Sequence, residues 1–343
     1  MLTPTSFIPE EDQGIIFTNV QLDDTATINR TNEVLDKIGE QVLRHEGIEY
    51  FISVAGYSLL GGGGENVALG VIGLKPWSER TAKNLSAASI ISSLTAEDSI
   101  DASAEINYFA PPAIPGIGNS DGLSLELLAT QGDVTPSELY ATMGGFLEKL
   151  NASPDMKYAF STFTSDTPHI YLDIDRTKLE AYKIPVSSLF TALQNNLGSR
   201  YINNITLNGQ VNKVIVQADF QYRKNLKDVE NMYVRSQTGA LIQVKSFADV
   251  STSISPKIIY RYNQYTSASI TAQSAEGVST GTAIDAVLNL AKQVLSNDYG
   301  IAWTGLSLQE VEAAGLAVFL IALALVFCYL FLVALYESWM LAF

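Results

Sequence analysis

The sequence predicts an α+β fold: two ferredoxin-like βαββαβ units, the second interrupted by an inserted mixed α/β subdomain, and one C-terminal transmembrane helix. Three observations support this prediction. Alternating and helical apolar periodicities follow one another in the order strand–helix–strand–strand–helix–strand. This order of elements recurs after residue 123, although the residues themselves do not repeat. Finally, residues 315–336 form a run of 22 residues without a charge.

The first unit covers residues 1–110 and opens with an apolar stretch, IIFTNVQL, at 15–22. Ile28, Val34, Leu35, Ile38 and Val42 then recur at the spacing of one helical face. A glycine-rich loop at 56–66 separates the two central strands. The predicted elements of this unit are strands at 15–22, 48–54, 67–74 and 100–109, and helices at 27–44 and 81–95.

The second unit is split into residues 111–161 and 256–305. Thr135-Pro136-Ser137-Glu138 has the pattern of a helix start, with threonine as the cap and glutamate closing a capping box. Between the two parts lies an insert, 162–255, in which Asn208-Gly209 signals a hairpin. Further predicted elements are strands at 123–129, 156–161, 170–174, 201–207, 211–218, 268–274 and 300–304, and helices from 135, at 186–197 and at 281–295.

Composition excludes several classes of protein. Hydrophobic residues make up 47% of the chain and charged residues 17%, which is not the balance of a disordered chain. The net charge of -15 disfavours nucleic acid as a partner. With one cysteine, Cys328, and two distant histidines, we expect no metal site and no cofactor. No nucleophile–base–acid set is visible, so we do not expect an enzyme.

The apolar run at 315–336 is predicted to cross a membrane. As a helix it would be about 33 Å long, which exceeds the hydrocarbon core of about 30 Å. Tyr336 and Trp339 suit the membrane interface. Residues 1–12 lack the features of a secretory signal peptide. If the acidic part is exported, we therefore expect a membrane helix upstream of this sequence.

Six short motifs, taken together, resemble the C-terminal half of RND (resistance-nodulation-division) efflux permeases of the hydrophobe/amphiphile type. The resemblance covers nearly the whole chain and includes the second periplasmic loop and the eighth transmembrane helix. Each motif alone is weak, but the six occur in the family's order and spacing. They are Phe7–Gly14 (FIPEEDQG), Leu74–Arg80 (LKPWSER), Pro111–Gly118 (PPAIPGIG), Arg261-Tyr262-Asn263, Trp303-Thr304-Gly305 and Leu335–Trp339 (LYESW).

This resemblance implies a part of a proton-driven pump that exports amphiphilic small molecules such as drugs, detergents and dyes. Residues 1–110 and the split unit would be porter subdomains in the periplasm, and the insert 162–255 a docking subdomain. Implied partners are two further copies in a homotrimer, a periplasmic adaptor, an outer-membrane channel and the Gram-negative inner membrane. The carboxylates and lysine of the family's proton relay have no counterpart in 315–336. The alternative is a membrane-anchored interaction protein, a relic that has lost pumping.

The resemblance also assigns a switch loop to the glycine run Gly61, Gly62, Gly63 and Gly64, with Tyr57, Leu59 and Leu60 as substrate contacts. Glycines reach unusual φ values, which suits a moving loop. A phosphate cradle is excluded because no Gly-Lys-Ser/Thr follows. An ordinary surface turn is the alternative. The insert hairpin, 203–218, would face the adaptor and channel, or be a plain edge hairpin.

The remaining candidate site is an apolar wall with a few polar groups, as pockets for amphiphiles have. Ordinary core packing is the alternative, most seriously for Ile52, Val54 and Val71. Phe160 stands where a basic residue often closes the family's access pocket. If Phe17 and Phe109 line a cleft, both should be partly accessible to solvent. The wall residues implied by the resemblance are Phe17, Ile52, Val54, Val71 and Phe109, with Asn19 and Asn107 as polar members.

Overall fold

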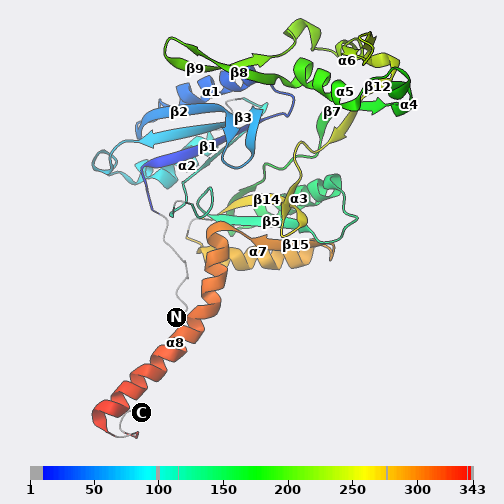
Figure 1. Ribbon diagram of the computed structural model, residues 1–343. Helices are drawn as coiled ribbons and strands as arrows, with labels where there is room; N and C mark the ends of the chain where they lie inside the picture. Colours follow the sequence, from blue (N-terminus) through cyan, green and yellow to red (C-terminus); the bar gives the residue numbers. More distant parts are fainter. Residues whose placement is uncertain (1–10, 98–100, 115, 276, 338, 341–343) are drawn as a thin grey trace. The chain divides into compact units, whose positions relative to one another are not determined.

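The computed structural model describes residues 11–97, 101–114, 116–275, 277–337 and 339–340 (Figure 1). The first four residues of the motif 7–14, as well as Pro115 and Ser338, lie outside this description. The chain divides into two compact units, Met1–Thr167 with Pro256–Phe343, and Pro168–Ser255. The predicted mixture of helices and sheets with one apolar C-terminal helix is confirmed.

The first sheet is antiparallel and has the strand order β2-β3-β1-β4. Helices α1 and α2 pack on one face, where Ile16, Val20, Val34, Ile38 and Ile90 form a core that is fully shielded from solvent. Even-numbered residues of β1 point to this core because side chains alternate along a strand. The elements are β1 (Ile15–Leu22), α1 (Ile28–Val42), β2 (Ile48–Ser58), β3 (Gly62–Leu74), α2 (Ala87–Ala96) and β4 (Ala104–Phe109).

The predicted loop at 56–66 is instead mostly strand. Tyr57 pairs with Gly63 and Ser58 with Gly62, so β2 and β3 form a hairpin whose tip is only residues 59–61. The Ser58 hydroxyl accepts hydrogen bonds from the amides of Leu60 and Gly61, at 3.1 and 2.9 Å. These bonds satisfy two backbone amides of the turn, so that the strands stay paired up to Ser58 and Gly62. The prediction of a long loop was therefore wrong, because glycine content alone does not exclude a ladder.

An ion pair between a buried arginine and a partly exposed aspartate closes one edge of this sheet-and-helix layer. Both terminal nitrogens of Arg80 bond the carboxylate of Asp12, at 2.9 and 3.0 Å, and only 2% of the arginine side chain is exposed. Arg80 also donates to the carbonyls of Lys75 and Leu85. The same Asp12 carboxylate accepts the amides of Gly14 and Ala87. Two of the sequence motifs, 7–14 and 74–80, thus meet here as a structural clasp at the start of α2.

Helix α2 starts later than predicted. The segment 81–86 contains a 3₁₀ turn, Lys83–Leu85, and the helix begins at Ala87 after Ser86, whose hydroxyl caps the amide of Ser89. Serine competes with the helical backbone for hydrogen bonds and so favours the cap over the interior. The boundary error therefore comes from cap chemistry that the apolar spacing does not reveal.

The second sheet has the order β13-β14-β5-β15, and β6 also pairs with β14. Leu125, Leu127, Ile270 and Phe146 lie in the core beneath α3 and α7. The capping box predicted at Thr135 and Glu138 is present. Strand β13 was not predicted. The elements are β5 (Leu123–Ala129), α3 (Pro136–Asn151), β6 (Met156–Phe160), β13 (Tyr260–Tyr262), β14 (Tyr265–Ser274), α7 (Thr280–Val294) and β15 (Tyr299–Trp303).

The unit Pro168–Ser255 falls within the predicted insert and has its own small core around Leu189, Val244 and Phe247. The hairpin at Asn208-Gly209 is present, and both residues have positive φ. Its strands expose apolar side chains on both faces. The elements are β7 (Thr167–Ile174), α4 (Arg176–Ala181), α5 (Val186–Leu193), β8 (Arg200–Leu207), β9 (Gln210–Val216), α6 (Leu226–Glu230), β10 (Tyr233–Arg235), β11 (Leu241–Gln243) and β12 (Ala248–Ser255).

Helix α8 (Gly305–Tyr336) runs on from β15 as one continuous helix (Figure 1). Its segment Phe319–Tyr336 has a mean hydropathy of 2.7 and, in this chain, none of it is buried. Among the described residues it is the helix long and apolar enough to cross a membrane, judged by length and composition. Its polar start, with Glu310 bonded to Thr280 of α7, ties it to the second sheet.

Candidate functional site

The predicted wall residues share one face of the first sheet, the face that α1 and α2 leave open. Directly paired residues of antiparallel strands point to the same side. Phe17 of β1 pairs with Val71 and Phe109, and Val71 pairs in turn with Ile52. A second row follows in the same register. The two rows are Phe109–Phe17–Val71–Ile52 and Asn107–Asn19–Leu69–Val54. All seven predicted positions are thus brought together.

The exposed fraction of the residues differs from one edge of this face to the other. At the β2 edge Ile52 is 53% and Val54 is 42% exposed, which is unusual for isoleucine and valine in a strand. Towards β4 the face becomes covered: Phe17 is partly exposed, but Phe109 is only 1% exposed. The two rings pack edge to face with their centroids 6.1 Å apart. The expectation that Phe109 is partly accessible was therefore wrong, whereas that for Phe17 is confirmed.

The two asparagines of the wall are held by side-chain hydrogen bonds. Asn19 is 2% exposed, and its side-chain oxygen accepts a 2.5 Å hydrogen bond from the Ser58 hydroxyl. Because Ser58 also caps the hairpin tip, Asn19 fixes that tip to the centre of the sheet. Asn107 donates to Glu105 two residues away and is partly exposed. Of the two asparagines, Asn107 is therefore the one placed to meet a ligand.

The hairpin tip stands at the end of this wall. Leu59 and Leu60 are partly buried, while Tyr57 is 46% exposed. The tip is anchored through its carbonyls: Leu59 accepts a bond from Asn119 at 2.9 Å, and Gly61 one from the Tyr260 hydroxyl at 3.3 Å. The glycines predicted as a switch loop are therefore tied, through Tyr260, to the segment that returns from the inserted unit.

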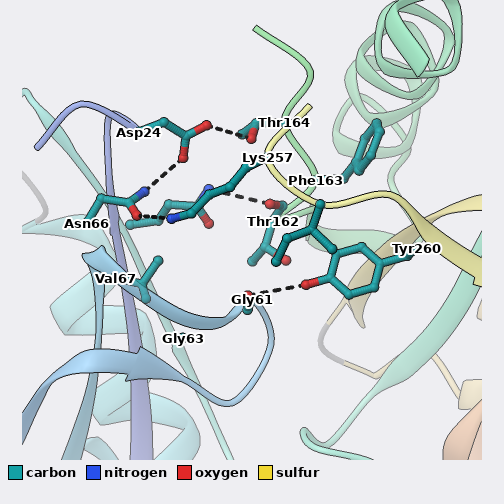
Figure 2. Close-up of a pocket in the computed structure, with 12 residues that line it drawn as sticks. Asp24, Gly61, Gly63, Asn66, Val67, Thr162, Phe163, Thr164, Lys257 and Tyr260 are labelled. Atoms are coloured by element: carbon teal, nitrogen blue, oxygen red, sulfur yellow. Dashed lines mark hydrogen bonds between the residues drawn. The ribbon is translucent and has the colours of Figure 1, made fainter. Parts of the chain in front are cut away.

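Beside Gly61 lies a small cavity of about 40 Å³, shown in Figure 2. Asp24, Asn66 and Lys257 meet across it, with Thr162 and Thr164 on the far wall (Figure 2). A cavity needs only about 10–15 Å³ of this kind of space for one water, whereas drug-sized ligands need several hundred Å³. The cavity thus suits a few water molecules and not an amphiphile.

A larger cavity, about 530 Å³, lies between α2 and the end of the second sheet. It has the volume of a small-molecule site, with apolar groups from Ile91, Ala110 and Val278 and charges from Glu11, Asp12 and Lys157. The sequence gives no sign of this cavity because its lining comes from segments far apart in the chain. Among the described residues, no three His, Cys, Asp or Glu side chains come together as a metal site.

Glu126 is a second feature that was not predicted from the sequence. It lies on β5, on the face turned away from the core, directly across from Ser269. Burial raises the pKa of its carboxyl, while hydrogen bonds from Ser267 and Ser269 act in the opposite direction. The alternation of LSLELLA does place Ser124, Glu126 and Leu128 on one face. What it could not show is that this face is largely buried.

We expect Glu126→Gln to stabilise the chain at neutral pH. Since the folded-state pKa is raised, the folded chain binds this proton more tightly than the unfolded chain does. The charge on Glu126 therefore destabilises the fold as pH rises above the ordinary value of 4.5. The uncharged amide should raise the thermal unfolding midpoint at pH 7 but not at pH 4. Circular dichroism melts at both pH values test this, and an equal shift at both would contradict it.

The family comparison covers the whole chain: the model of the family described as AcrB/AcrD/AcrF matches residues 1–343. The chain belongs to the AcrB/AcrD/AcrF family. The resemblance to RND efflux permeases drawn from six motifs is thereby confirmed.

Several curated proteins are similar to this chain over 98–99% of its length. "Multidrug resistance protein MdtF" of Escherichia coli K12 is 33% identical over 345 residues, 99% of this chain and 33% of that protein. "Multidrug export protein AcrF" of the same strain is 32% identical, over 98% of this chain and 32% of that protein. "Toluene efflux pump membrane transporter TtgB" of Pseudomonas putida is 31% identical, over 98% of this chain and 32% of that protein. The chain thus spans about a third of the length of the curated relatives it matches.

Proposed function

We propose that this chain is the periplasmic porter and docking part of an inner-membrane, proton-driven efflux pump for amphiphilic compounds. In this proposal the two sheet-and-helix layers are ferredoxin-like porter subdomains, 1–110 and 111–161 with 256–305. The insert 162–255 is the docking subdomain, and α8 spans the membrane. The pump would act as a homotrimer with a periplasmic adaptor and an outer-membrane channel.

The observation that carries the proposal is the open face of the first sheet. A sheet face without covering helices usually turns polar side chains to water. Here the face keeps Ile52, Val54 and Phe17 at least partly exposed, beside the amide of Asn107. Apolar surface with a few polar groups is what loosely selective binding of amphiphiles requires. Family membership and the names of the relatives, which are a multidrug resistance protein, a multidrug export protein and a toluene efflux pump transporter, support the same interpretation.

Replacing Ile52 by serine tests the wall. Full burial of an isoleucine side chain against a ligand contributes about 1.5–3 kcal/mol, so export of a neutral lipophilic dye such as Nile red should slow by about tenfold. Leu43→Ser is the matched control, because Leu43 is also 53% exposed but follows α1 on the helix side of the sheet. The initial export rate is measured in cells at equal pump abundance. Equal rates for the two variants would contradict the wall.

A further inference from the structure

Two connectors, residues 162–167 and 256–260, lead into and out of the inserted unit Pro168–Ser255. Both make hydrogen bonds to the first sheet, its hairpin tip or the turn after β1. On the entering connector, Thr162 accepts a hydrogen bond from the Gln21 side chain at 3.4 Å. Further along it, the hydroxyls of Thr164 and Thr167 donate to one oxygen of Asp24. Gln21 of β1 and Asp24, just after this strand, therefore hold the connector through three contacts before it enters the inserted unit Pro168–Ser255.

The leaving connector is held by two long side chains. Lys257 donates to the side-chain oxygen of Asn66 at 3.0 Å, and Tyr260 donates to the carbonyl of Gly61 at 3.3 Å. Figure 2 shows both bonds, one from Lys257 to Asn66 and one from Tyr260 to Gly61 of the hairpin tip. Tyr260 thus bonds Gly61, the first glycine of the run, whereas Lys257 bonds Asn66, two residues beyond the last glycine, Gly64.

Asn66 joins the two connectors into one network. It is 2% exposed, and its amide nitrogen donates to the Leu22 carbonyl at 3.1 Å and to Asp24 at 3.0 Å. With both protons used, its oxygen is left to accept from Lys257. Asp24 in turn accepts from the threonines of the entering connector. A displacement of either connector therefore disturbs bonds made by the other.

The glycine run makes room for this arrangement. A Cβ on Gly64 would lie 2.6 Å from the Lys257 nitrogen and 2.9 Å from the Asn66 oxygen. A Cβ on Gly61 would lie 3.6 Å from Thr162. The absence of side chains is therefore explained at Gly64 by the close passage of Lys257, independently of any need for a flexible backbone.

We propose that Lys257 and Tyr260 are positioning residues that latch the β2–β3 hairpin to the connectors of the inserted unit, so that hairpin and connectors move together. Few bonds make the latch, and each neutral or charge-assisted hydrogen bond contributes modestly in net terms. It can therefore open and close without unfolding either sheet. Its meaning for transport rests on the proposed function, since it would link the docking part to the substrate wall.

Amide hydrogen exchange on the full chain in lipid nanodiscs tests the latch without using transport. Tyr260→Phe and Lys257→Met should each speed exchange of residues 59–64 by about three- to tenfold, the range expected from losing one hydrogen bond. Strands β1 and β5 should keep their rates. Lys257→Arg retains a donor and should restore most of the protection. Lys292→Met, on α7, is the control and should change nothing in the hairpin.

A second exchange experiment tests the opposite direction, because coupling between two sites must act both ways. Gly64→Ala alters only the hairpin but displaces the flexible Lys257 side chain. It should therefore speed exchange in residues 162–167 and 256–260 as well. Unchanged exchange in those connectors, or a uniform rise across both sheets in any variant, would overturn the latch. Failure of the export proposal would show in the Ile52→Ser assay instead and would leave these exchange results standing.

Discussion

Arg80→Ala should destabilise the first sheet and its helices by about 1.5–3 kcal/mol, the loss expected for hydrogen bonds to a charged group, because the Asp12 side chain is 27% exposed and water can solvate the carboxylate that is left. The guanidinium is 2% exposed and bonds Asp12 with two nitrogens, as well as two backbone carbonyls. Its loss leaves the Asp12 carboxylate without a counter-charge and frees the start of α2. The measurement is urea unfolding followed by tryptophan fluorescence. Lys83→Ala, at an exposed lysine nearby, should stay within about 0.5 kcal/mol of the parent chain.

The pH dependence gives an independent check on the same clasp. The Arg80 hydrogen bonds hold the pKa of Asp12 at about 2, below its ordinary value of 3.8. A depressed pKa means that the stabilisation is present above pH 3.8 and is lost as pH falls towards 2. The parent chain should lose this increment in acid, and Arg80→Ala should lose much less of it. Parallel acid profiles of the two proteins would show that the pair contributes nothing.

The sequence predicted most accurately those features that depend on alternation. Strand β1 was placed at its observed bounds because IIFTNVQL buries one face completely, which fixes both its type and its register. Once the register was fixed, Phe17 and Asn19 had to share a face with their partners on β3 and β4. The wall residues themselves came from the family resemblance, and the observed strand pairing places them on one face.

What could not be predicted depends on contacts between segments far apart in the chain. Nothing local to Gly64 indicates that Lys257, almost two hundred residues later, passes over it. The hairpin was mistaken for a loop because Ser58 satisfies its turn from within a strand. Strand β13 escaped notice because three residues are too few to show a period.

Phe109 shows the same limit on a residue of the proposed site. Its position on the open face follows from pairing with Phe17, but its burial depends on how the end of β4 is covered. A phenylalanine that is 1% exposed resembles Phe146, at 0%, in the core of the second sheet. We therefore expect Phe109→Ala to cost about 3–5 kcal/mol, as for core phenylalanines, and not the smaller loss expected of an accessible pocket residue.

A milder substitution separates packing from binding. Phe109→Leu keeps the site apolar and removes fewer atoms than the alanine variant does, so it should cost less than the about 3–5 kcal/mol of Phe109→Ala and leave most molecules folded. If the ring also shapes the wall through its edge-to-face contact with Phe17, export of bulky aromatic dyes per folded molecule should fall severalfold, because the leucine cannot orient Phe17. Phe146→Leu, with a similar packing cost, should leave that specific rate unchanged. Identical specific rates in the two variants would make Phe109 a packing residue alone and confine the wall to Phe17, Val71, Ile52 and Val54.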